Sequence, residues 1–135
     1  ERNQQIIDEI NSCTKNPQII LAKIFVKNLA DFSNKKLIAF CGIANPSKFF
    51  MLLNQQNLNV VQEISFSDHH DYQESEITDL LNMSSQQNCQ LITTKKDWVK
   101  FSSQNQKQIN YLDIELEFDN IDCIIATIKN LINHV

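Results

Sequence analysis

The chain has 135 residues and a formal net charge of −4, so a dominant basic surface for nucleic acid or anionic membrane is not expected. Hydrophobic residues make up 42% and charged residues 21%, which is typical of one ordinary globular domain with a real core. Its four cysteines are scattered without a Cys-x-x-Cys pair, which predicts reduced thiols in a cytosolic compartment. No apolar run approaches the roughly 20 residues that cross a bilayer, and no signal-peptide pattern opens the chain.

Helix and strand patterns alternate along the chain. Apolar or alternating runs predict strands over residues 19–26 (where a helix is also open), 36–43, 58–66, 90–93 and 109–118. Helical spacing predicts helices over residues 2–12, 47–55, 74–85 and 120–133. A further helix is expected after Thr94, which can cap it, with Asp97 three residues on as a weaker capping box; this helix is expected to include Trp98, Val99 and Phe101.

This alternation predicts an α/β fold. A β-α unit repeated about four times favours a single three-layer α/β/α domain with a mostly parallel, open sheet of about four to five strands. Right-handed crossovers place every βα loop at one edge of such a sheet. Residues 42–46, 67–73 and 93–96 then share that edge, where α/β proteins place their ligands.

The chain contains a single glycine, Gly42. Loops of the G-x-x-x-x-G-K-[ST] and G-x-G-x-x-G kinds need several glycines, because their backbone approaches phosphate closely. The chain therefore has no standard nucleotide-binding loop of its own.

Titratable side chains of complementary chemistry crowd together at Asp68-His69-His70-Asp71, directly after a strand-like run. Histidine changes charge near neutral pH, and a neighbouring carboxylate can hold its tautomer, so Asp68 and His69 are candidates for proton handling. The alternative is a solvated loop whose aspartate caps a turn. A metal site is not expected, because adjacent residues rarely converge on one ion without ligands from elsewhere.

Other polar residues at the same edge are candidates for substrate or phosphate binding: Asn45, Lys96 and His70. Asn45 is most simply the N-cap of the helix that Pro46 begins, with anion contact as a second interpretation. Lys96 belongs to a small basic cluster that is either a solvated helix face or an attraction for phosphate. For His70, positioning or surface exposure is the simpler interpretation.

Three segments resemble the tetraacyldisaccharide 4′-kinase (lipid A 4′-kinase) family. AFCGIANPSKFF (residues 39–50) resembles the family's AFAGIGNPERFF, FSDHHDY (66–72) its FPDHHPY, and LITTKKDWVK (91–100) its LLMTEKDAVK. Their order and spacing also fit, and the similarity runs from about residue 36 to the end. The chain departs from the family where Ala44 replaces a glycine, where Lys95 replaces a glutamate, and where Gln73 stands at a frequent threonine cap.

The resemblance implies a transferase of lipopolysaccharide synthesis in Gram-negative bacteria. Such a kinase moves the γ-phosphate of ATP to the 4′-hydroxyl of an acylated glucosamine disaccharide 1-phosphate, giving lipid IVA. It implies two α/β domains, with ATP and Mg²⁺ bound mainly by an N-terminal P-loop domain and a C-terminal domain acting as a lid. Residues 1–135 would be that lid, inactive alone, with the last helix (about 120–134) packing toward the absent half.

The resemblance also implies a role for one histidine. The family's histidine falls on His69 and its preceding aspartate on Asp68, and the histidine forms a dyad with an aspartate of the other domain that helps to deprotonate the sugar hydroxyl. The implied location is the cytoplasmic face of the inner membrane, with membrane contact through the absent half and no nucleic-acid partner.

Two other functions stay open on the residues alone. One is a manganese phosphoesterase of the class named after an Asp-His-His motif, although the upstream aspartates and glycine-rich turns of its two-metal site are lacking. The other is a non-catalytic α/β binding module.

Overall fold

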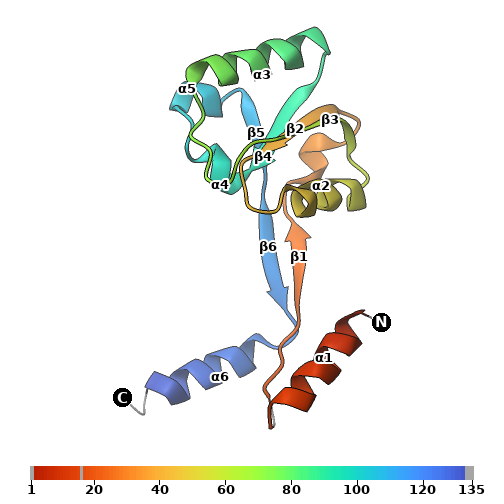
Figure 1. Cartoon of the computed structure of the whole chain (residues 1–135), viewed down its shortest axis with the longest axis vertical. Coiled ribbons are helices and arrows are strands. Elements are labelled where there is room, and N and C mark those ends of the chain that lie inside the picture. Colours follow the sequence, from red (N-terminus) through yellow and green to blue (C-terminus); the bar gives the residue numbers. More distant parts are fainter. Residues whose placement is uncertain (1, 16, 133–135) are drawn as a thin grey trace. The chain divides into compact units, whose positions relative to one another are not determined.

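The computed structural model describes residues 2–15 and 17–132, and the chain divides into two compact units (Figure 1). Unit 2 comprises Val26–Ile114, and unit 1 comprises the described residues on either side of it. The elements of unit 2 are η1 (Leu29–Phe32), β2 (Lys36–Cys41), α2 (Pro46–Gln55), β3 (Asn59–Ser65), α3 (Glu74–Gln86), β4 (Gln90–Thr94), α4 (Lys95–Trp98), α5 (Ser103–Gln106) and β5 (Ile109–Leu112).

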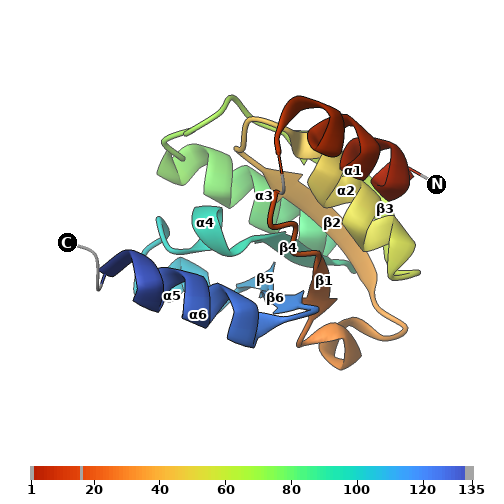
Figure 2. The same cartoon turned by 90° about the horizontal axis from the view of Figure 1, so that it is seen from below.

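The sheet of unit 2 has four strands in the order β3-β2-β4-β5, and every neighbouring pair is parallel. β2 and β4 are neighbours in both views (Figure 1, Figure 2). The chain passes from β2 to β3 on one side and then crosses to β4 on the other. The strand order therefore reverses at the carboxyl end of β2, which is the position where open α/β sheets bind ligands.

Strand β2 carries the core on both of its faces. Leu37, Ala39 and Cys41 pack into one apolar cluster with residues of α2, and Ile38 and Phe40 pack into a second cluster with residues of α3. The helical partners are Phe49 and Leu53 in the first cluster and Ile77 and Leu80 in the second. A strand buried on both faces needs an almost continuous apolar run, as residues 36–43 have. The predicted α/β fold, with helices on both faces of a parallel sheet, is confirmed in unit 2.

Unit 1 contains two helices and most of two strands: α1 (Arg2–Cys13), β1 (Ala22–Val26), β6 (Ile114–Phe118) and α6 (Ile121–Ile132). The last residue of β1, Val26, and the first residue of β6, Ile114, fall in unit 2. β1 and β6 lie side by side in a two-stranded sheet (Figure 1). The strands are antiparallel, because the N–H of Asp119 donates to Leu21 O (3.0 Å) at one end and the N–H of Lys27 donates to Asp113 O (2.8 Å) at the other. Among the described helices, none combines the length and apolarity that a bilayer crossing requires.

Three expectations need correction. The alternating run 109–118 is two strands, because Asp113 leaves the parallel sheet and its N–H donates to Asn28 Oδ1 (2.9 Å). The strand expected over 19–26 is shorter, as β1, and pairs with β6; the parallel sheet has four strands, within the expected four to five. The helix after Thr94 ends already at Trp98, and α5 follows as a separate short helix.

Candidate functional site

Three βα loops meet at the carboxyl ends of β2, β3 and β4. The N–H of Phe66 donates to Cys41 O (2.9 Å) and the N–H of His69 donates to Gly42 O (3.2 Å), so the loop after β3 is bonded to the loop after β2. The third connection, where β4 passes directly into α4, joins them through Asp97 of α4, whose carboxylate accepts from the N–H of Gly42 (2.9 Å). The predicted common edge therefore exists, and it coincides with the reversal of strand order.

Asp68 and His69 lie at the outer side of this edge. The His69 side chain is 74% exposed, and its Nε2 lies 3.7 Å from Asp68 Oδ2. Its backbone is left-handed (φ 57°), while Asp68 Oδ1 accepts from the N–H of His69 (3.0 Å). A histidine in this backbone region carries strain that the surroundings must hold in place. The result is an imidazole that faces solvent beside one carboxylate and stays accessible to a group from outside.

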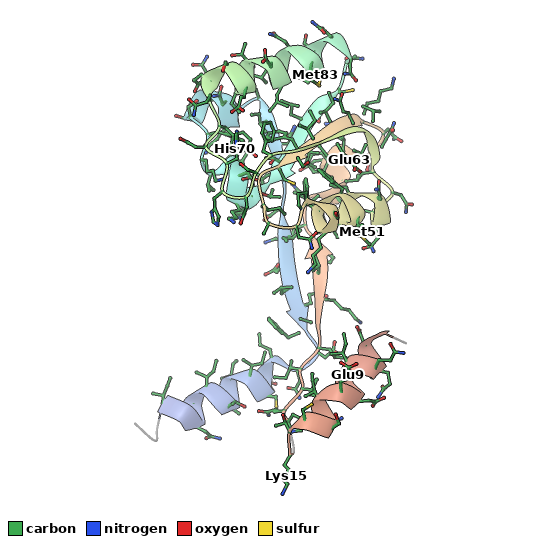
Figure 3. The ribbon with its side chains drawn as sticks, in the orientation of Figure 1. Glu9, Lys15, Met51, Glu63, His70 and Met83 are labelled. Atoms are coloured by element: carbon green, nitrogen blue, oxygen red, sulfur yellow. The ribbon has the colours of Figure 1, made fainter. Side chains whose placement is uncertain are left out.

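His70 lies in the loop between β3 and α3 (Figure 3) and is much more enclosed than His69. Its Nε2 lies 2.9 Å from Glu76 Oε2 and its Nδ1 lies 3.3 Å from Ser67 Oγ. The ring packs against both Phe66 and Tyr72, at centroid distances of 4.7 and 4.9 Å. Both ring nitrogens face protein atoms, which favours positioning over direct substrate contact for His70.

Glu76 fastens His70 to the start of α3. Its Oε2 also accepts from the N–H of Gln73 (2.8 Å), as the third helical residue does in a capping box. This backbone donor, followed by the His70 ring, lowers the pKa of Glu76 below its ordinary value of 4.5. Sequence reasoning missed Glu76, although the Gln73-x-x-Glu76 spacing was a signal for it.

Asp97 is fully buried beneath the three loops. Its Oδ2 accepts from the N–H of Gly42 and from Thr94 Oγ1 (both 2.9 Å), and its Oδ1 accepts from Lys100 Nζ (3.0 Å). The N–H of Asp97 donates in turn to Thr94 Oγ1 (3.1 Å), so the predicted cap of the helix after β4 is confirmed. Lys100 Nζ also donates to His70 O (3.1 Å). Sequence reasoning treated Asp97 as a helix cap and did not anticipate this network.

Tyr72 and Cys41 are neutral components of the site. Tyr72 Oη is buried and has no hydrogen-bond partner within the described part of the chain. Its ring contacts the aromatic rings of Phe40, Phe66 and Phe101. Burial, then the Asp97 carboxylate, raises the pKa of Tyr72 above its ordinary value and that of Cys41 to about 11. Neither residue is therefore a ready nucleophile or base at neutral pH.

Asn45 and Lys96 are exposed at the rim. Asn45 occupies the predicted N-cap position of α2, but its side chain makes no capping hydrogen bond there; only its carbonyl accepts, from the N–H of Lys48 (3.3 Å). Lys96 Nζ lies 3.9 Å from Asp68 Oδ1. The structure thus brings Lys96 to the Asp68–His69 pair. Across residues 2–15 and 17–132, the acidic, histidine and cysteine side chains form no group of three that could hold a metal ion.

The chain is similar in sequence to known proteins. The sequence model of the family Tetraacyldisaccharide-1-P 4'-kinase matches residues 2–133. The tetraacyldisaccharide 4'-kinase of Rickettsia typhi is 39% identical over 107 residues, which cover 79% of this chain and 33% of that protein. The enzyme of the same name from Agrobacterium fabrum is 33% identical over 108 residues, which cover 76% and 31%. The chain therefore spans about a third of the length of the curated relatives it matches.

A solved structure matches at the level of the fold. The crystal structure of LpxK from Aquifex aeolicus, described as an "apo" form in complex with ATP, superposes with a TM-score of 0.57. The match covers 87% of this chain and 37% of that one, at 19% sequence identity. At this identity the likeness supports the α/β arrangement and no more.

Proposed function

The chain belongs to the tetraacyldisaccharide-1-P 4'-kinase family, and from this premise we propose that it works as the C-terminal lid of a lipid A 4′-kinase. The reaction is transfer of the γ-phosphate of ATP to the 4′-hydroxyl of tetraacyldisaccharide 1-phosphate, which gives lipid IVA. The observation that carries the proposal is the exposed Asp68–His69 pair at the carboxyl edge of the parallel sheet, in a chain of this family. The proposed location is the cytoplasmic face of the inner membrane, with membrane contact through the remainder of the kinase.

ATP and Mg²⁺ are assigned to a P-loop domain outside these 135 residues. The chain has one glycine and therefore no standard phosphate-binding loop, and its described acidic, histidine and cysteine side chains form no group of three that could hold a metal ion, so both ligands are proposed to be bound mainly by that domain. Phosphoryl transfer depends mainly on positioning and on neutralising charge around the phosphates. The chain alone is therefore proposed to be inactive, and its contribution is what its own side chains do.

His69 is proposed to take the proton that the 4′-hydroxyl loses as its oxygen attacks the γ-phosphorus, in a dyad with an aspartate of the P-loop domain. The Asp68 carboxylate lies 3.7 Å from the imidazole and is the nearest acidic group to it within its own loop. Lys96 and Asn45, both exposed at the rim, are proposed to contact phosphate or substrate. His70, also a candidate from the sequence, is better suited to positioning because its ring nitrogens face Glu76 and Ser67.

The last helix is proposed to pack against the P-loop domain. One face of α6 carries an apolar stripe at helical spacing whose side chains are 43% to 67% exposed: Ile121, Ile125, Ile128 and Ile132. The relatives are about three times as long as the part that this chain matches. We therefore propose that the rest of such a kinase covers this apolar stripe. In a complete kinase, Ile128→Lys should lower the melting temperature, whereas Asn130→Lys on the same helix should not. Equal effects of the two variants would exclude the stripe as a domain interface.

The experiment is a chimaera in which this chain replaces the matching third of the R. typhi kinase. The chimaera should phosphorylate the disaccharide, and the 135 residues alone should not. His69→Ala should lower kcat by about 10² to 10⁴ with little change in KM, since it removes a group that acts in the transition state. Asn57→Ala is the matched control, because Asn57 is exposed and has the same left-handed backbone (φ 56°) without a place in the site.

The outcomes separate the competing functions. Turnover by the isolated chain would exclude the lid assignment, and an unchanged kcat for His69→Ala would remove His69 from catalysis. An inactive chimaera beside an active R. typhi parent would count against the proposed function. The family match favours the kinase over a manganese phosphoesterase. Mn²⁺ binding at residues 68–71 together with phosphodiesterase activity would reverse that preference. If replacing His69 changed no measured activity, a binding module would be favoured.

A further inference from the structure

The backbone on either side of the His69–His70 peptide bond is tied to one buried carboxylate. The N–H of His69 donates to Gly42 O (3.2 Å), and the N–H of Gly42 donates to Asp97 Oδ2 (2.9 Å). On the other side, His70 O accepts from Lys100 Nζ (3.1 Å), which also donates to Asp97 Oδ1 (3.0 Å). These five residues form a closed set of hydrogen bonds, called here the Asp97 network.

The Asp97 network lies where solvent has little access to its charged groups. Asp97 is 0% exposed, and the Lys100 side chain is 29% exposed with its Nζ 5.6 Å from the centre of the Tyr72 ring. Charge-assisted hydrogen bonds in such surroundings are stronger and less screened than those at the surface. The Gly42 N–H, from the loop after β2, and the Lys100 ammonium, three residues after Asp97, are therefore both held firmly on the Asp97 carboxylate.

We propose that Asp97 and Lys100 are positioning residues that hold the left-handed turn at His69, and through it the direction of the His69 imidazole. A left-handed histidine persists only where neighbouring contacts overdetermine it, and the Asp97 network bonds its backbone on both sides. Lys100 touches no reacting atom in this role. The catalytic part of this inference rests on the proposed function of His69, whereas the holding of the turn does not.

The first experiment uses the 135-residue chain and measures amide hydrogen exchange by NMR. Lys100→Met keeps the apolar stem and removes the donors. It should accelerate exchange of the His69 amide about tenfold or more while leaving the Phe66 amide, bonded to Cys41 O (2.9 Å), unchanged. Lys107→Met, at an exposed lysine outside the network, is the matched control. Equal acceleration at the His69 and Phe66 amides would overturn the proposal, because a lysine that only stabilises the fold would affect both. Unchanged exchange at both amides would overturn it as well.

The second experiment measures kinetics in the chimaera with the R. typhi kinase. Lys100→Met should lower kcat by about 10- to 100-fold with KM nearly unchanged, as small misplacements of catalytic groups do. Lys100→Arg should restore part of the loss, and Lys100→Met should have no further effect on a His69→Ala background. A normal kcat, or the same loss on that background, would overturn the positioning role. An inactive wild-type chimaera would count against the proposed function, and hydrogen exchange would still decide whether the pair holds the turn.

Discussion

The only glycine of the chain gives the sharpest test of the packing at the site. A Cβ on residue 42 would lie 3.0 Å from His70 Cβ, 3.1 Å from Ser67 O and 3.1 Å from Tyr72 Oη. Optimal contacts between carbon atoms lie at about 3.5–4.0 Å, so Gly42→Ala must displace the loop after β3 or the Tyr72 side chain. One of the three neighbours is a backbone oxygen, which gives way less easily than a side chain.

The magnitude follows from three contributions. Overpacking a well-packed position costs about 1–3 kcal/mol, and restricting the unfolded chain by replacing glycine returns about 0.4–1 kcal/mol. Gly42 does not have a positive φ, so left-handed strain adds nothing. Any displacement of residue 42 also weakens the bond from its N–H to Asp97, and a hydrogen bond to a charged group contributes about 1.5–3 kcal/mol. We expect a net loss of about 1–3 kcal/mol in the free energy of unfolding.

The assay is urea unfolding followed by fluorescence of Trp98, the only tryptophan. Its Nε1 donates to Ile109 O (2.8 Å), so its emission reports unit 2. Ala44→Ser, an exposed change two residues along the same loop, is the control and should stay within about 0.5 kcal/mol of wild type. A Gly42→Ala protein as stable as wild type would refute the described packing of the three loops.

Two further predictions concern titratable groups. Because the pKa of Glu76 is lowered from 4.5 by the N–H of Gln73 and by His70, its charged form stabilises the folded chain at higher pH, and that stability is lost as the pH falls through the lowered value. Urea titrations should therefore show Glu76→Gln below wild type at pH 7 and equal to it at strongly acid pH; a constant gap would contradict this. Cys41 is buried with a pKa of about 11, so a thiol reagent at pH 8 should label exposed Cys13 quickly and Cys41 only on unfolding. Equal native labelling rates would contradict that burial.

The parallel core was predictable because its signal is local. A strand buried on both faces must be apolar at nearly every residue, and residues 36–43 show this directly, as β2 confirms. Pairing was not predictable in the same way. The run 109–118 alternates evenly, yet it splits where Asp113 bonds with Asn28, which lies 85 residues earlier in the chain. Alternation predicts a strand but carries no information about the partner of each half.

The candidate site was likewise predictable only where its signal is local in sequence. Asp68 and His69 were identifiable because their side chains are adjacent in sequence and follow a strand. Lys100 reaches His70 across 30 residues and Asp97 reaches Gly42 across 55, so their roles exist only in the folded chain. Resemblance to the family located the loops that matter, and the geometry then distinguished exposed His69 from enclosed His70.

The residues at which this chain departs from the quoted family segments lie outside the Asp97 network. Lys95, which replaces a glutamate, donates to Asp113 Oδ1 (3.3 Å) and lies 5.4 Å from the centre of the Tyr111 ring, outside the Asp97 network. Ala44 is exposed, and Gln73 contributes its backbone N–H to Glu76 whatever its side chain.

All five members of the network keep the residue of the quoted family segments: Gly42, His69, His70, Asp97 and Lys100. A buried ion pair is a weak source of stability by itself, because desolvation offsets its attraction. The arrangement is better explained by the geometry that the pair imposes, since one buried carboxylate fixes the backbone on both sides of the His69–His70 bond and leaves the imidazole of His69 exposed.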